Sequence, residues 1–267
     1  MTAPETVWHF NRALLRSPAH SIAQGLRAQD RGDPDMAGVL AEHTAYRAAL
    51  EAAGLRCEVL PATEAHPDSV FVEDPALVFS RGAIVLRPGA PSREPEAAAL
   101  APELRARFAT VLDIGPEGYA DGGDVLVLPG RVLIGLSART DRAGAAGLVR
   151  ALDRLGLRGE VVKTPPGVLH FKSDCALVGP DTVLTTARLD ASGVFAGLRR
   201  LVVPEGEEPA ANALRVNDRL LMAEGYPRTA EVLAQAGPAP VMLPTAQIAR
   251  VDAGLSCMSL RWFDPAA

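Results

Sequence analysis

The sequence is poor in cysteine and lysine. Its 267 residues include three cysteines, Cys57, Cys175 and Cys257, and no two of them form a C-x-x-C pair. A small and odd number of cysteines argues against a disulfide framework and favours a reducing compartment. Lysine occurs only at Lys163 and Lys172, and arginine supplies the rest of the 27 basic residues. We interpret this imbalance as a compositional bias without functional meaning.

Long apolar runs are also missing. None approaches the roughly 18 residues of a membrane helix, and residues 1–10 lack the basic start and apolar core of a signal peptide. The net charge of −5 argues against a nucleic-acid partner. No linker or low-complexity segment divides the chain. The sequence therefore predicts a soluble, cytoplasmic protein with one domain spanning residues 1–267, and no membrane or nucleic-acid partner.

Metal-ligand spacing is absent as well. His9, His20, His43 and His66 form no H-E-x-x-H or similar pattern, and no paired cysteines accompany them. We therefore expect neither a metal nor another cofactor.

What the sequence does contain is a recurring unit of two short apolar runs joined by a turn. The runs are Val70–Phe79 with Ala83–Arg87, Asp124–Leu128 with Val132–Leu136, Val168–Val178 with Thr182–Thr186, Ala213–Val216 with Arg219–Ala223, and Leu255–Phe263, which Thr6–Leu15 would complete. The units begin near residues 73, 122, 170, 212 and 257, which are 42 to 49 residues apart. A repeat in this range is typical of solenoids and propellers.

Helical patterns lie between these pairs. Asp33-Pro34 offers an N-cap with a proline in the first turn, before an apolar pattern over residues 36–50. A stripe from Leu148 to Leu155 ends at Gly156, and a shorter helix over 229–236 stops at Gly237. The pattern predicts five β-β-α-like units in a closed ring, although periodicity alone leaves an ordinary α+β domain open.

Reactive side chains occupy similar points of successive units. Glu73 and Asp74 open the first unit, Asp121 the second, His170 the third and Cys257 the fifth, while Asn212 stands in the fourth. A ring would gather them around one cavity, where carboxylates orient a cation, a thiol attacks carbon and an imidazole moves protons.

Each of these residues also has a structural explanation. A lone cysteine in an apolar run usually packs in the core, which is how we interpret Cys57 and Cys175. Cys257 differs, because Gly254 and Ser256 beside it suit an exposed strand start. His170 alone would suit a core histidine, and Asp121-Gly-Gly-Asp a tight turn.

Taken together, seven sequence blocks resemble the dimethylarginine dimethylaminohydrolases, a family of the guanidine-modifying (pentein) superfamily. The blocks are PDSVFVED (67–74), RPGAPSR (87–93), DGGD (121–124), GLSART (135–140), LHFKS (169–173), GYPRT (225–229) and DAGLSC (252–257). The resemblance implies the fivefold pseudosymmetric α/β-propeller of ββαβ-like units.

The resemblance also implies roles for individual residues. Cys257 would be the nucleophile, His170 the general acid/base and Asp121 the catalytic carboxylate. The remaining positions would bind substrate: Asp74, Glu73 and Asp252 at the guanidinium end, Arg93 and Arg139 at the α-carboxylate, and Asp68 with the backbone of Leu26 at the α-amino group. One departure is Phe171, where relatives often have an aliphatic residue, and we expect it to reshape the pocket wall.

The implied reaction is cysteine-dependent hydrolysis of Nω-methylated arginine to citrulline and an amine, through a covalent S-alkylthiouronium. A thiol-alkylating reagent should then label Cys257 before the other two cysteines. An arginine deiminase or another guanidine-modifying enzyme stays open as the alternative, and a non-catalytic binding pentein is disfavoured by the acidic balance. The expected partner is a guanidino amino acid, and a homodimer stays open.

Overall fold

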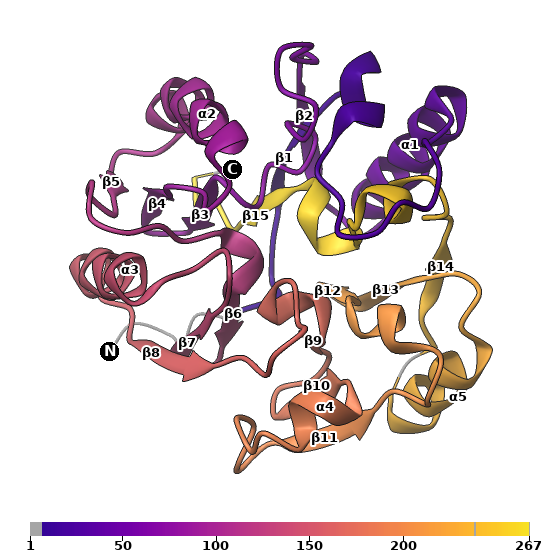
Figure 1. Cartoon of the computed structure of the whole chain (residues 1–267). Coiled ribbons are helices and arrows are strands. Elements are labelled where there is room, and N and C mark those ends of the chain that lie inside the picture. The colour runs from indigo at the N-terminus through magenta and orange to yellow at the C-terminus, as the bar shows by residue number, and fades with distance from the viewer. Residues whose placement is uncertain (1–6, 238, 267) are drawn as a thin grey trace.

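The computed structural model describes residues 7–237 and 239–266, and it shows five small β-sheets arranged in a ring (Figure 1). In each sheet an antiparallel strand pair is followed by a helix and then by a third strand, which pairs in parallel with the middle one. The sequence prediction of five units in a closed ring is therefore confirmed, and the ordinary α+β alternative is wrong.

Four units run continuously along the chain. The first two are β3 (Ala76–Phe79), β4 (Gly82–Val85), α2 (Glu94–Arg107) and β5 (Val111–Asp113), then β6 (Val125–Leu128), β7 (Arg131–Leu136), α3 (Arg142–Arg154) and β8 (Gly159–Lys163). The next two are β9 (Cys175–Leu177), β10 (Thr182–Thr185), α4 (Ala187–Asp190) and β11 (Arg199–Val202), then β12 (Leu214–Val216), β13 (Arg219–Ala223), α5 (Pro227–Ala236) and β14 (Val241–Leu243).

The fifth unit joins the two ends of the chain and closes the ring. Strand β15 (Leu260–Trp262) pairs antiparallel with β1 (Arg12–Arg16), which pairs in parallel with β2 (Arg56–Leu60) after α1 (Met36–Ala52). The predicted closing run is therefore a strand from Arg12 onward, and Thr6 lies outside the described residues.

Three of the predicted apolar runs are longer than the strands, because they include the turns that precede β3, β9 and β15. Residues 70–75 form turns before β3, 171–173 a 3₁₀ turn before β9, and 255–258 a 3₁₀ turn before β15. These turns are largely buried inside the ring, and their apolar residues give them the sequence pattern of a buried strand. Each turn leads into the first strand of its unit.

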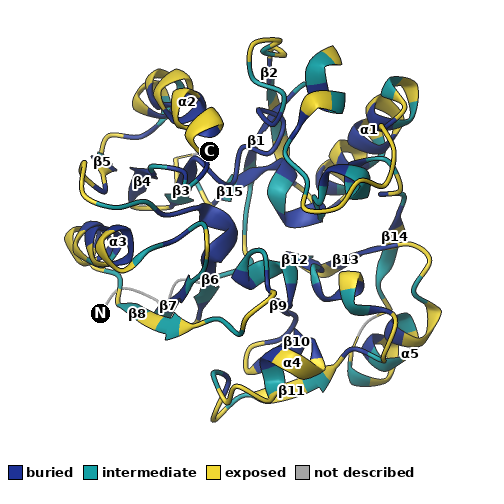
Figure 2. Cartoon of the chain, in the orientation of Figure 1, coloured by how far each residue is buried: buried dark blue, intermediate teal, exposed yellow. Residues whose placement is uncertain are grey.

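The helices lie around the outside of the ring, with exposed outer faces and buried inner faces (Figure 2). Helix α1 is capped by Asp35, whose Oδ2 accepts from Gly38 N at 2.8 Å. The prediction of Asp33 as the cap is wrong, because the Asp33 carboxylate pairs with Arg27 at 2.7 Å. The predicted end of α3 is confirmed, since Gly156 has a φ of 71° that favours glycine.

Apolar clusters fill the spaces between neighbouring units, so each unit packs on the next. One cluster joins β3–β5 to β6, β7 and α3, and another joins β6 and β7 to β9, β10 and α4. No helix in the described part of the chain is long and apolar enough to span a membrane.

Candidate active site

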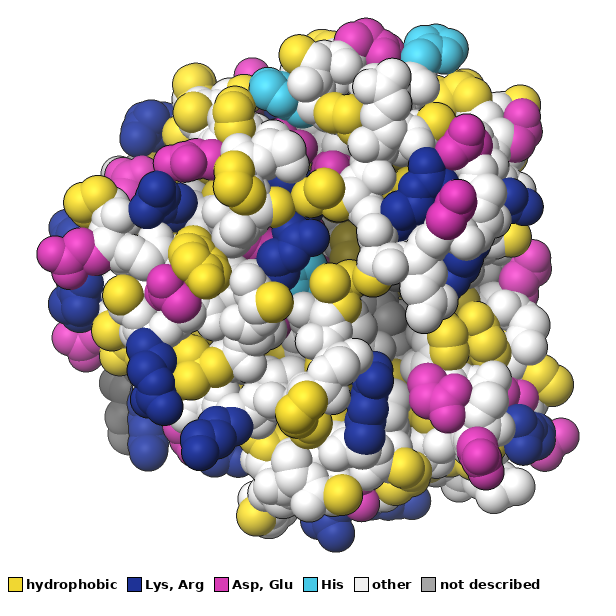
Figure 3. Space-filling model, in the orientation of Figure 1, with side chains coloured by type: hydrophobic (Ala, Val, Ile, Leu, Met, Phe, Trp, Pro, Cys, Tyr) yellow, Lys and Arg dark blue, Asp and Glu magenta, His cyan; other side chains and the backbone are white. Residues whose placement is uncertain are grey.

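The turns that precede the first strands meet at one pocket of about 150 Å³. The face that Figure 3 shows is hollowed near its centre, where basic and histidine side chains are visible. The pocket is lined by Leu26, Arg27, Ala28, Asp68, Phe71, Asp74, Arg93, Arg139, Leu169, His170, Val251, Asp252, Ala253 and Cys257. Eight of the ten predicted site residues are among them, and Asp121 and Glu73 are not.

Asp121 is fully buried directly behind the His170 ring. The distance from His170 Nε2 to Asp121 Oδ2 is 3.0 Å, and the other oxygen of Asp121 accepts from Gly89 N at 2.7 Å. The backbone N–H of Asp121 donates to Thr140 Oγ1. Asp121 is therefore placed to orient the imidazole and to stabilise its charged form.

The two glycines of the Asp121-Gly-Gly-Asp turn allow the chain to approach its neighbours closely. A Cβ on Gly122 would lie 2.0 Å from the Glu73 carbonyl oxygen. A Cβ on Gly123 would lie 2.7 Å from His170 Nδ1 and 2.9 Å from Asp74 Oδ1. Any side chain here would push the acid and the imidazole apart, which explains the motif physically.

The surroundings of His170 favour its charged imidazolium form. Burial alone would lower its pKa, but the charge of Asp74 and the hydrogen bond to Asp121 outweigh burial and raise the pKa of His170 to about 9. An imidazolium in this position can protonate a departing amine.

Asp74 is held in place by Arg93. The Arg93 guanidinium pairs with Asp74 and with Glu96, and it also donates to the carbonyl oxygens of Asp68 and Phe71. Burial raises the pKa of Asp74, but Arg93 and then His170 lower it more, so the net direction is downward. Asp74 thus stays ionised and able to bind a cation.

The same contacts occupy the guanidinium of Arg93. Arg93 lines the pocket, yet its side chain is 5% exposed and binds acids and carbonyls of the protein itself. Its expected contact with the substrate α-carboxylate stays a prediction. Arg139 also lines the pocket and is half-buried, and its guanidinium makes no ion pair within residues 7–237 and 239–266.

Cys257 lies in the 3₁₀ turn before β15, with its thiol in surroundings that disfavour the thiolate. Burial, then the charges of Asp74 and Glu73, raise the pKa of Cys257 to about 12. The pKa of Cys57 is raised less, to about 11, chiefly by burial. Labelling of Cys257 before the other two cysteines by an alkylating reagent stays a prediction, and it requires a factor that favours its thiolate over these surroundings.

Asp68, Leu26 and Asp252 also line the pocket. Both oxygens of Asp68 accept from Leu26 N, at 3.0 and 3.2 Å. Asp252 Oδ2 accepts from Ala28 N, and its Oδ1 lies 3.7 Å from Arg31. These acids therefore tie residues 26–31 to the pocket wall, and their contacts with substrate stay predictions.

Two predictions need correction. The Glu73 carboxylate does not line this pocket, because it points the other way and contacts Lys172, Arg261 and Ser256. Phe171 does not form the pocket wall, because it is fully buried against Phe195 with the ring centroids 5.9 Å apart.

Two polar residues, Asp124 and Asn212, support the site although they were assigned no role in it from the sequence. Asp124 accepts from Phe171 N, Ser137 Oγ and Thr140 Oγ1, which links the Asp121 turn to the His170 turn. Asn212 exchanges two hydrogen bonds with Ser256, beside Cys257. The signals were present: Asp124 ends the Asp121-Gly-Gly-Asp motif, and Asn212 occupies the equivalent point of the fourth unit.

One oxygen or nitrogen each from Asp74, Asp121 and His170 lies within 4.8 Å of the other two, as in a metal site. In this structure, however, the His170 ring pairs with Asp121, and Asp74 pairs with Arg93. The expected independence of metal stays a prediction.

The fold and this site define a guanidine-modifying α/β-propeller, and comparison with known proteins agrees. The family model described as arginine deiminase matches residues 55–191. The N-terminal domain of a cyanobacterial arginine dihydrolase has the same fold, with a TM-score of 0.81 at 18% identity over 95% of this chain and 99% of that one.

Closer similarity is found to dimethylarginine dimethylaminohydrolases. The Pseudomonas aeruginosa protein of that name is 37% identical over 95% of this chain and 100% of its own, and the Streptomyces coelicolor protein is 37% identical over 94% and 96%. A cysteine-to-serine mutant of the Pseudomonas aeruginosa enzyme, complexed with citrulline, superposes with a TM-score of 0.91 at 36% identity, covering 95% of this chain and 99% of that one. The chain belongs to the dimethylarginine dimethylaminohydrolase family.

Proposed function

We propose that this protein hydrolyses Nω-methylated arginine to citrulline and the corresponding methylamine, and that residues 1–267 act as one catalytic domain. The observation that carries the proposal is the composition of the Cys257 pocket. A thiol, a protonated imidazole and Asp74 share one pocket with Asp68 and Arg139, so its wall offers partners for every charged group of an amino acid with a guanidinium side chain.

Substrate binding prepares the nucleophile. Asp74 would fix the guanidinium so that Cys257 meets its central carbon face-on. In the free protein the pKa of Cys257 is about 12, so the thiol is neutral. The bound cation offsets the negative charges around the sulfur and lowers the thiol pKa, so the thiol proton is released to solvent when the substrate binds.

The chemistry would proceed in two halves. The thiolate of Cys257 forms a bond to the guanidinium carbon, and the carbon–nitrogen bond to the methylated amine breaks as His170 protonates that nitrogen. The product of this half is an S-alkylthiouronium. His170, now neutral, takes a proton from water, and the hydroxide adds to the same carbon. The carbon–sulfur bond then breaks with its electron pair returning to Cys257, and the hydroxyl proton passes to solvent as the ureido product is released. Asp121 stabilises His170 in the steps in which the imidazole is charged.

Asp68 and Arg139 would select a full amino acid. Asp68 offers a carboxylate for the α-ammonium group, and Arg139 offers a planar fork for the α-carboxylate. Agmatine lacks the carboxylate and should therefore bind poorly. The cytoplasmic location and the homodimer stay predictions.

A deiminase that acts on unmethylated arginine is the second candidate, and the match to the arginine deiminase model favours it. The two activities share the covalent step and differ in the leaving group, which is ammonia for arginine. The test is to incubate pure protein with dimethylarginine, monomethylarginine, arginine and agmatine and to assay citrulline or the corresponding ureido product. The proposal requires higher kcat/KM for a methylated arginine than for arginine, and the reverse order would favour the deiminase.

A further inference from the structure

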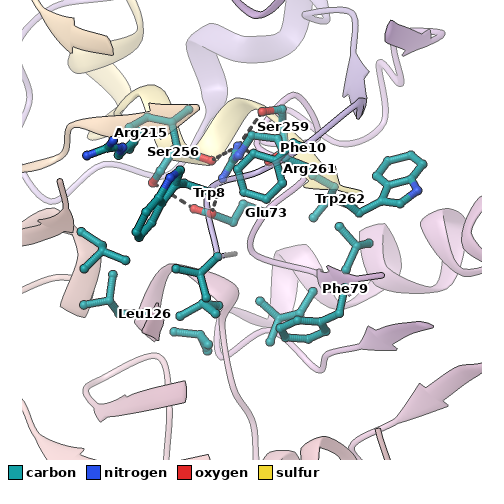
Figure 4. Close-up of a pocket in the computed structure, with 18 of the residues that line it drawn as sticks. Trp8, Phe10, Glu73, Phe79, Leu126, Arg215, Ser256, Ser259, Arg261 and Trp262 are labelled. Atoms are coloured by element: carbon teal, nitrogen blue, oxygen red, sulfur yellow. Dashed lines mark hydrogen bonds and ion pairs between the residues drawn. The ribbon is translucent and has the colours of Figure 1, made fainter. Parts of the chain in front are cut away.

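Figure 4 shows a second cavity, of about 160 Å³, which we call the rear cavity. Glu73 and Ser256 line this second cavity, whereas the residues that follow them in the chain, Asp74 and Cys257, line the active-site pocket. A single layer of backbone therefore separates the two spaces. The reaction proposed above uses the active-site pocket and assigns no role to the rear cavity.

The charged residues that line the rear cavity carry a net positive charge, and two of its cations share one acid, Glu73. Lys172 Nζ lies 2.5 Å from Glu73 Oε1, and Arg261 Nη2 lies 3.3 Å from the same oxygen. The side chains of Lys172, Arg261 and Glu73 are only 12%, 10% and 6% exposed. Asp74, which also feels the charge of Lys172, is already paired with Arg93. Buried charges of one sign are unfavourable unless counter-charges accompany them.

Other residues of the rear cavity also make its lining positively charged. Arg215 contributes a third cation, with its guanidinium carbon 4.8 Å from the centroid of the Trp8 ring. Glu73 is the only acid among the described residues that line the cavity. The buried Nε of Arg261 has no hydrogen-bond partner within residues 7–237 and 239–266. Arg261 Nη1 already donates to Tyr46, Ser256 and Ser259, and Nη2 to Glu73, so its open donor within the described part of the chain is Nε. With three cations against one acid, the lining of the cavity favours an additional carboxylate.

The rest of the wall is apolar. Figure 4 shows Phe79 and Leu126 on the side away from Arg261 and Glu73, with Trp8 and Trp262 flanking the space between them. An apolar cavity of about 150 Å³ is large enough to bind benzene. The rear cavity, at about 160 Å³, thus has room for a body of about one aromatic ring.

We propose that the rear cavity is a binding site for a small organic carboxylate with an apolar body about the size of one aromatic ring. The carboxylate would meet Arg261 and Lys172, and the apolar body would pack between Trp8, Trp262 and Leu126. The site is separate from the active-site pocket, so the ligand and a substrate or product can bind at the same time.

The chain provides its own reporter for this site, because its only two tryptophans, Trp8 and Trp262, both line the rear cavity. The experiment is a titration of the full-length protein with phenylacetate, followed by intrinsic tryptophan fluorescence, with 2-phenylethanol as the uncharged control. The expected result is a saturable change for phenylacetate, with affinity about tenfold or more higher than for the alcohol. The titration is repeated with citrulline at saturation, and the affinity for phenylacetate should not change.

Two variants locate the ligand. Arg215→Gln removes a cation of the cavity, and Val127→Phe fills part of its apolar wall. Both should weaken phenylacetate binding, whereas Arg219→Gln, on the neighbouring strand and outside the cavity, should not. The proposal is overturned if phenylacetate gives no saturable change, if the alcohol binds equally well, or if citrulline displaces phenylacetate. The last result would place the carboxylate in the active-site pocket instead.

Discussion

Arg139 provides the sharpest test of how the substrate is recognised. It lines the pocket at half burial, without an ion pair in the described part of the chain, so its guanidinium is available to a ligand carboxylate. Removing one member of a desolvated charge pair costs about 2–5 kcal/mol. Because Arg139 is only half-buried, we expect the lower part of this range, about 2–3 kcal/mol, which corresponds to a loss of about 30- to 150-fold.

The assay compares kcat/KM of Arg139→Ala and wild type for dimethylarginine and for agmatine, which never had a carboxylate. The large loss should appear with dimethylarginine, and the change with agmatine should be much smaller. Arg142→Ala is the matched control, because Arg142 is exposed at the start of α3 and does not line the pocket. Equal losses with both substrates, or no loss with either, would refute the role of Arg139 in binding the α-carboxylate.

Three further predictions follow from the same site. Asp121→Asn should lower the pKa of His170 from about 9, as measured by proton NMR of its ring. Because the pKa in the folded protein lies above 6.5, the charged His170 stabilises wild type below pH 6.5, and this contribution is lost as the pH rises through 9. The free energy of unfolding should therefore depend less on pH in the variant. Gly123→Ala should lower kcat by about 100-fold, because its Cβ would lie 2.7 Å from His170 Nδ1. Gly237→Ala should retain wild-type kcat, because a Cβ there would meet no atom of the described residues within 4 Å. Prolonged chelation should leave the rate unchanged, and a loss that one divalent metal restores would indicate a metal held by Asp74, Asp121 and His170.

The ring could be predicted from the sequence because its repeat is regular and each unit carries its own turn. Strand limits could not, since residues in the turns before β3, β9 and β15 are as apolar as those in strands. Helix α2 was not predicted, because it has Pro102 inside and no clear apolar stripe to mark it.

The site was predictable only in part, for a physical reason. Motifs identify which side chains are reactive, but they do not show which way a carboxylate points. Glu73 and Asp74 are neighbours in the sequence, yet one lines the rear cavity and the other the active-site pocket. Arg93 was expected at the substrate, and the structure shows in addition that it pairs with Asp74 and Glu96. The high pKa of the free Cys257 thiol likewise arises from burial and charges contributed by distant segments.

The central claim is that Cys257 forms a covalent bond to the guanidinium-derived carbon. The most direct measurement is peptide mass spectrometry of protein quenched after mixing with S-methyl-L-thiocitrulline, whose methanethiol leaves more readily than an amine. His170→Gly should slow release of the adduct and let it accumulate. We predict a mass increase equal to the compound less methanethiol, located on Cys257, in wild type, His170→Gly and Cys175→Ser, and none in Cys257→Ser. An adduct on another residue, or turnover of dimethylarginine by Cys257→Ser at the wild-type rate, would contradict the account.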